Sequence, residues 1–134
     1  MKGFLLTHKG MEDIAALEVN EAINKKSRLN DGCIVFDISK FEDLFKLCYL
    51  SQSAIGVYFL LSEFEYKDLF KDFKKNVESI DFTEWLNEKV TFRVKCAKDF
   101  ENNLLAQDLE KDFGAIIIEH IQKKCKYKQK NIAN

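Results

Sequence analysis

The sequence predicts an α+β protein, and three observations support this class. Segments whose apolar residues recur at spacings of three and four, typical of amphipathic helices, are interleaved with short runs of β-branched and aromatic residues, typical of strands. In the first half of the 134-residue chain these segments follow the order β-α-β-β-α-β. A content of 46% hydrophobic and 32% charged residues is that of an ordinary globular protein with a real core.

The elements of the first half follow from local patterns. Glu12 and Asp13 place negative charge in the first turn of the first helix, where the helix dipole favours it, and Ser39 with Glu42 forms a capping box that starts the second. This order is the split βαβ arrangement called ferredoxin-like, and it closes near Glu65, so we assign residues 1–65 to a first domain. The expected elements are strands at 4–6, 27–29, 33–38 and 56–64, a helix at 11–23, and a second helix that starts at the capping box and carries Leu44, Phe45, Leu47 and Cys48.

The second half, residues 66–134, starts a new pattern. Apolar spacing predicts a helix at 69–80, Asp81 with Glu84 gives a capping signature for another helix, and a long helix is expected at 106–124. The stretch "KVTFRVKC" (89–96) predicts a strand by alternation, with apolar side chains on one face and Arg93 and Lys95 on the other.

This single strand needs a partner, because its backbone polar groups cannot be left unsatisfied. Either it joins the first sheet or its partner strands lie in sequence that follows. Since the chain ends just after a strand-to-helix crossover, we interpret it as the N-terminal fragment of a longer protein, cut inside its second domain.

Gly114 interrupts the long helix, at a cost of about 1 kcal/mol relative to alanine. We expect the absence of a β-carbon to allow the helix to approach a sheet or a neighbouring helix closely.

The charge is distributed unevenly along the chain. Five lysines and no acid follow residue 122, so that a chain of net charge −1 carries −6 before that point. The C-terminal end is therefore a strongly basic segment on a mildly acidic body. Such a terminus is either a solvated tail or a surface for a polyanion.

Other functional classes find little support. Cys33, Cys48, Cys96 and Cys125 are widely scattered, so we expect no metal site, and we interpret the first three as reduced, buried residues that pack as small hydrophobes. No charge-free apolar run approaches membrane-spanning length, and a cytoplasmic location is expected. No catalytic constellation is visible, because the chain has no Gly-rich nucleotide loop and no proline, and His8 and His120 have no evident partner.

Four stretches together resemble the N-terminal part of THUMP-containing RNA-modifying enzymes, especially the tRNA guanosine-N2 methyltransferases and their bacterial ribosomal RNA relatives. In that family a ferredoxin-like domain precedes a THUMP domain, and a Rossmann-type methyltransferase domain follows. The matching segments are "FLLTHKGMEDIAALEV", with Gly10 and Glu12 at family positions; "VYFLLSEFEYKDLFKDFKKNVESIDFTEWL"; "TFRVKC"; and "LLAQDLEKDFGAIIIEHI", with Gly114 at the family glycine.

The resemblance implies that residues 66–134 are the first part of a THUMP domain, which holds the acceptor end of tRNA through phosphate contacts. Such contacts position a nucleic acid without reading its sequence, and they require cations on a rigid scaffold. It implies S-adenosylmethionine as the cofactor of the parent protein, with none in this segment, and a C-terminal methyltransferase domain as partner. The residues assigned to RNA binding are Arg93, Lys95, Lys98, Lys123, Lys124, Lys126 and Lys128.

The sequence departs from the family pattern at two points. The loop "AKDFENN" contains Lys98 as its only base, and the chain stops at "NIAN", where the family has an Asn-Pro-Asp turn. Two alternatives stay open. The parent could be a THUMP-type thiouridine or pseudouridine synthase, or the chain could be a self-standing α+β module that binds a protein through its acidic body.

Overall fold

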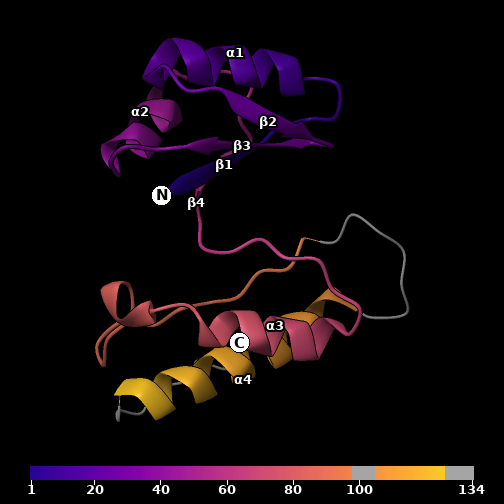
Figure 1. The fold of residues 1–134 in the computed structure, drawn as a ribbon, viewed down its shortest axis with the longest axis vertical. Coiled ribbons are helices and arrows are strands. Elements are labelled where there is room, and N and C mark those ends of the chain that lie inside the picture. Colours follow the sequence, from indigo (N-terminus) through magenta and orange to yellow (C-terminus); the bar gives the residue numbers. More distant parts are fainter. Residues whose placement is uncertain (98–104, 126–134) are drawn as a thin grey trace. The chain divides into compact units, whose positions relative to one another are not determined.

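The computed structural model describes residues 1–97 and 105–125. The chain divides into two compact units, Met1–Glu63 and Phe64–Asn134. Figure 1 shows a sheet with helices in the first unit and paired helices in the second.

The first unit confirms the predicted order β-α-β-β-α-β. All three strand pairs are antiparallel, and the strands are arranged in the order β2-β3-β1-β4, with β1 and β3 in the centre. The elements are β1 (Lys2–Leu6), α1 (Glu12–Ile23), β2 (Ser27–Asn30), β3 (Cys33–Asp37), α2 (Glu42–Leu50) and β4 (Gly56–Leu60).

The core of this unit lies between the sheet and its two helices. Both helices cover the same face of the sheet (Figure 1), and strand alternation directs Leu5 and Ile34, which are paired across β1 and β3, toward them. These two side chains and Leu47 of α2 are completely buried. A mixed α+β fold with one antiparallel sheet follows from this packing.

Glu12 joins two turns at one end of the sheet. Its carboxylate accepts hydrogen bonds from the backbone N–H groups of Gly10 and Gly32, both at 2.8 Å. The two glycines have φ of +94° and +69°, values that side-chain-bearing residues rarely adopt. The Gly32 N–H is the main cause of a lowered pKa at Glu12.

The start of α2 differs from the predicted capping box of Ser39 and Glu42. The N-cap position, Phe41, makes no side-chain capping bond, and the buried carboxylate of Asp43 instead accepts the backbone N–H groups of Ser39 (2.8 Å) and Lys40 (3.2 Å). The acid that satisfies the helix start is therefore one residue later than predicted.

The second unit contains α3 (Leu69–Glu78), a short 3-10 helix η1 (Phe82–Glu84) and α4 (Ala106–Cys125). The predicted helices at 69–80 and 106–124 are confirmed. Asp68 caps α3 by accepting the N–H of Lys71, and stacked rings of Phe73 and Phe113, with centroids 4.0 Å apart, join α3 to α4.

The prediction of a helix after Asp81 was wrong, because only one 3-10 turn forms there. Asp81 does act as a cap, accepting bonds from the N–H (3.0 Å) and the hydroxyl (2.6 Å) of Thr83. The following residues contain no apolar stripe long enough to continue a helix, and Trp85 remains 37% exposed.

The strand predicted at 89–96 is not formed as part of a sheet. Residues 91–97 keep the predicted alternation, with Phe92, Val94 and Cys96 half-buried and their neighbours exposed. The sheet of the first unit contains β1 to β4 and does not include this segment. The alternation is therefore that of a strand, but no partner strand pairs with it in the described part of the chain.

Gly114 does not mark a tight approach among the described residues. A β-carbon at this position would lie 3.8 Å from Cγ2 of Val94, an ordinary van der Waals distance. The prediction that Gly114 allows a close approach of the helix to its neighbours is thus wrong for the described residues.

Candidate nucleic-acid interface

Arg93 and Lys95 lie on the exposed side of the extended segment 91–97. The opposite side of the segment faces α4, where Val94 is next to Gly114 and the N–H of Cys96 donates to Oε1 of Glu110 at 2.9 Å. These contacts hold the backbone on one helix and leave both cationic side chains free to meet solvent or a ligand.

Lys123 lies in the last turns of α4 and is exposed. Its Nζ forms an ion pair with Oε1 of Glu119 at 2.8 Å, one helical turn earlier. This hydrogen bond lowers the pKa of Glu119 and raises the pKa of Lys123, so both groups stay charged at neutral pH.

The three predicted cations whose side chains the structure describes, Arg93, Lys95 and Lys123, do not form one cluster. Gly114, beside Val94, and Lys123 are separated by nine residues of α4, or about 13 Å of helix rise. Lys124 belongs to α4, but its side chain is outside the described part, and Lys98, Lys126 and Lys128 lie outside the described residues. The predicted interface therefore consists of at least two separate cationic positions on the second unit.

A hollow of about 300 Å³ between α3 and α4 adds a cation that sequence reasoning missed. Lys74 of α3 lines it together with Lys123, and the charge of Lys74 also contributes to the lowered pKa of Glu119. The signal in the sequence was the spacing of Lys71, Lys74 and Lys75, which places all three near one face of a helix. The other lining residues are Val77, Glu78, Ile116, Glu119 and His120.

His120 has a packing role, as expected from its lack of a catalytic partner in the sequence. Its Nε2 lies 3.1 Å from the carbonyl oxygen of Ile80, and its ring meets Phe82 edge-on with centroids 6.0 Å apart. The imidazole thus ties α4 to the segment that follows α3.

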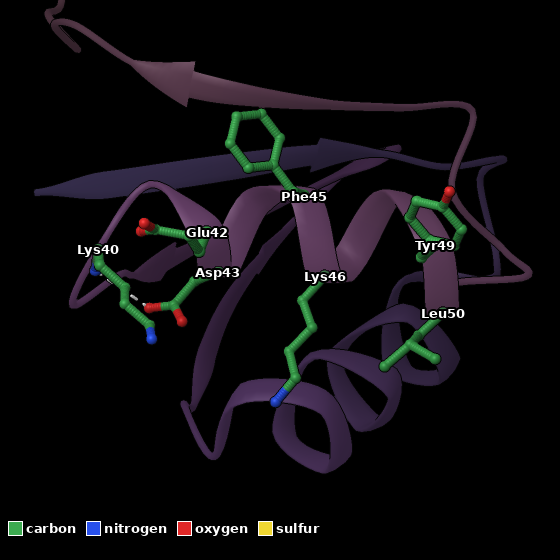
Figure 2. Close-up of a pocket in the computed structure, with 7 residues that line it drawn as sticks. All are labelled: Lys40, Glu42, Asp43, Phe45, Lys46, Tyr49 and Leu50. Carbon is green, nitrogen blue, oxygen red and sulfur yellow. Dashed lines mark hydrogen bonds between the residues drawn. The ribbon is translucent and has the colours of Figure 1, made fainter.

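A second hollow, of about 500 Å³, lies on the outer surface of α2 (Figure 2). Its aromatic residues are Phe45 and Tyr49, which are 64% and 93% exposed. The buried acid in it, Asp43, is already engaged by the backbone at the helix start. These residues provide neither a nucleophile paired with a base nor a nucleotide-binding loop, so the hollow offers no evident chemistry.

The thiols of three cysteines are described by the structure. Cys33, Cys48 and Cys96 are free thiols; Cys33 and Cys96 are half-buried, and burial raises the pKa of Cys33. Cys48 is exposed, so its expected buried position was wrong: it falls on the solvent side of α2. Within residues 1–97 and 105–125, no group of three His, Cys, Asp or Glu side chains could hold a metal ion, and none of the described helices is long and apolar enough to span a bilayer.

Comparison with known proteins points to methyltransferases. No family model matches the chain. It is 27% identical over 126 residues, 92% of its length, to a tRNA (guanine(6)-N2)-methyltransferase of Methanocaldococcus jannaschii.

Three solved structures have the same fold. A possible methylase from Clostridium difficile 630 matches 97% of the chain with a TM-score of 0.80 and 20% identity. A predicted N6-adenine-specific DNA methylase from Listeria monocytogenes matches 93% with a TM-score of 0.77 and 14% identity. A candidate methyltransferase complexed with SAH matches 93% with a TM-score of 0.77 and 17% identity.

The chain spans about a third of the length of each of these proteins: 33% of the archaeal enzyme and 35%, 32% and 33% of the three structures in the order given. It is similar in sequence to part of a tRNA (guanine-N2) methyltransferase and similar in fold to part of several methylase structures.

Proposed function

We propose that this chain is the RNA-binding, substrate-positioning N-terminal segment of an S-adenosylmethionine-dependent tRNA (guanine-N2) methyltransferase. The observation that carries the proposal is the similarity of nearly the whole chain to one third of an archaeal enzyme of that activity. A structure solved with SAH among the proteins of similar fold agrees with S-adenosylmethionine as the cofactor of the parent protein.

The two units fit the two expected domains. The strand order β2-β3-β1-β4, with two helices on one face of the sheet, supports the proposal that the first unit is a ferredoxin-like domain. The second unit, with its extended segment 91–97 followed by α4, fits the beginning of a THUMP domain. In that segment exposed and half-buried side chains alternate as in a strand, but no described strand pairs with it. This is expected when the strands that complete its sheet belong to another part of the protein.

In this proposal the second unit binds the acceptor end of tRNA by its phosphates and the parent's C-terminal domain carries out methyl transfer. Exposed cations on a rigid support suit this task, because phosphate contacts fix the position of the nucleic acid. Arg93 and Lys95 are held by the contacts of their neighbours with α4, and Lys123 lies in the last turns of that helix.

Two other functions compete with this one. A THUMP-type thiouridine or pseudouridine synthase would use the same segment, but the similar proteins are described as methyltransferases or methylases. A protein-interaction module is favoured by one observation, the exposed apolar side chains of α2, chiefly Phe45, Tyr49 and Leu50.

Salt dependence separates RNA binding from a hydrophobic protein interface. We expect full-length tRNA to bind the chain with an affinity that falls steeply between 50 and 200 mM salt, because several phosphate contacts release counterions. Fluorescence anisotropy with labelled tRNA measures this slope. Binding that is absent at 50 mM, or insensitive to salt, would contradict the RNA-binding proposal.

A further inference from the structure

A row of three lysines runs along the outer face of α3. Lys71, Lys74 and Lys75, which we call the α3 lysine stripe, are all exposed. Lys71 has Lys74 at i+3 and Lys75 at i+4, so these two consecutive lysines lie about one turn from Lys71 on the same side of the helix. None of the three was included among the cations assigned from the sequence.

Two acids at the start of α3 are engaged by backbone N–H groups and not by the side chains of the stripe lysines. Asp68 accepts the N–H of Lys71, and Asp72 accepts the N–H groups of Lys67 (2.9 Å) and Asp68 (3.3 Å). Both carboxylates are therefore occupied by backbone groups at the helix start. Within the part of the chain that the structure describes, none of the three lysines of the stripe takes part in an ion pair.

The stripe is continuous with the basic end of α4. Lys74 and Lys123 line the same hollow between the two helices. Inside the hollow, Glu78 and Glu119 balance the charges of these two lysines, whereas Lys71 and Lys75 are exposed and do not line the hollow. A polyanion would therefore lie along the outer face of α3 and reach the end of α4, rather than enter the hollow.

We propose that the α3 lysine stripe binds the phosphate backbone of the RNA, extending the interface from the end of α4 across α3. This inference rests on the proposed function. Lys71 and Lys75 form no ion pair within the described residues, so their ammonium groups are available to phosphates, and such contacts do not need to read the bases.

A membrane surface fits less well. An amphipathic helix binds a bilayer through its apolar face. That face of α3 is packed inside the unit, since Phe73 stacks on Phe113 of α4 and Val77 is 3% exposed.

The test compares charge-matched variants of the full chain in tRNA binding across 50 to 200 mM salt. The stripe variant is Lys71→Gln/Lys74→Gln/Lys75→Gln. The control variant removes three exposed lysines of the first unit, Lys26→Gln/Lys40→Gln/Lys46→Gln. We expect the stripe variant to bind roughly tenfold or more weakly at low salt, with a salt slope smaller by about two to three, while the control stays close to the original.

Two further variants guard against loss of folding. Replacing the same three residues by arginine keeps the charge and should keep the affinity. Glu78→Gln removes a negative charge one turn from Lys74 and Lys75 and should strengthen tRNA binding and steepen its salt dependence. If the glutamine stripe variant loses its helical circular dichroism, these two variants decide the question.

The outcomes separate the two claims. If the original chain does not bind tRNA, the proposed function and this inference both fail. If it binds with a steep salt slope but the stripe and control variants behave alike, or Glu78→Gln has no effect, only the inference fails. Binding to anionic lipid vesicles that depends on the stripe, without stripe-dependent tRNA binding, would also overturn it.

Discussion

Glu18 acts as a clamp on the loop between α2 and β4, and its removal should weaken the first unit. The carboxylate accepts hydrogen bonds from the hydroxyls of Ser51 (2.5 Å) and Ser53 (2.8 Å). It also accepts the backbone N–H groups of Gln52 (3.2 Å) and Ser53 (3.3 Å). One side chain of α1 thus holds three consecutive residues of a loop more than thirty positions away in sequence.

The expected magnitude follows from these four bonds. A hydrogen bond to a charged group contributes about 1.5–3 kcal/mol when buried, and solvent around this half-exposed carboxylate reduces that figure. Glu18→Gln keeps the shape and one accepting oxygen but turns an amide NH₂ toward donors. We therefore expect the free energy of unfolding to fall by about 1–2 kcal/mol at pH 7.

The effect should depend on pH with a defined sign. Burial acts to raise the pKa of Glu18, but the hydrogen bonds from Ser51, Ser53 and Gln52 outweigh it, and the pKa is lowered from its ordinary 4.5. The folded state therefore binds this proton less readily than the unfolded state. The stabilisation is present above the unfolded pKa and is lost as the pH falls through the folded pKa, so the original and Glu18→Gln should converge in acid.

Urea unfolding followed by far-UV circular dichroism at pH 7 and in acid measures both effects. Glu21→Gln is the matched control, since it removes the same charge from an exposed position of the same helix. Equal losses for Glu18→Gln and Glu21→Gln at pH 7, or a difference between Glu18→Gln and the original that grows on acidification, would refute the reasoning.

Three other predictions concern packing and ligand binding. Gly3→Ala should destabilise the first unit by about 1–3 kcal/mol in urea unfolding. The new β-carbon would lie 2.7 Å from Cδ2 of buried Leu44 and 2.9 Å from the ring of buried Phe36. An unchanged unfolding midpoint would contradict this prediction and show that these side chains can move aside. Gly114→Ala should leave the fold intact and raise the free energy of unfolding by up to about 1 kcal/mol. The new β-carbon would have Cγ2 of Val94, at 3.8 Å, as its nearest described neighbour. A clear loss of stability would contradict this and indicate a contact with residues outside the described part. The chain should bind no S-adenosylmethionine in calorimetry, because neither its sequence nor its described residues provide a nucleotide-binding loop. Saturable binding would contradict the assignment of the cofactor to the rest of the parent protein.

Local patterns were sufficient for most of the first unit. The β-branched and aromatic residues of segment 33–38 and the helical spacing from Met11 predicted the right elements, because each signal extends over several residues and agrees with the neighbouring elements. The start of α2 depended instead on which carboxylate accepts hydrogen bonds from the backbone N–H groups before the helix. Ser39 with Glu42 and Asp43 alone are both reasonable in sequence, and only the geometry selects Asp43.

The second unit shows where such reasoning stops. A strand is defined by its partner, so the correct alternation at 91–97 could not produce a strand without one. The capping signature at Asp81 was real, but a cap does not extend a helix beyond its apolar stripe, and a 3-10 turn resulted.

The candidate interface was predictable only in part. Arg93 and Lys95 are exposed, as strand alternation required, and Lys123 lies in the final turns of α4. The proximity of Lys74 to Lys123 depends on how α3 packs against α4, which no local pattern encodes. The spacing of Lys71, Lys74 and Lys75 was visible, but the engagement of Asp68 and Asp72 with backbone groups was not.

The central claim, that this segment holds the acceptor end of tRNA, is tested most directly by comparing intact tRNA with tRNA lacking its 3′ single-stranded end in the same binding assay at low salt. The account predicts that the intact molecule binds clearly more tightly. Equal affinity for the two would contradict it, since the phosphates contacted would then lie elsewhere on the tRNA.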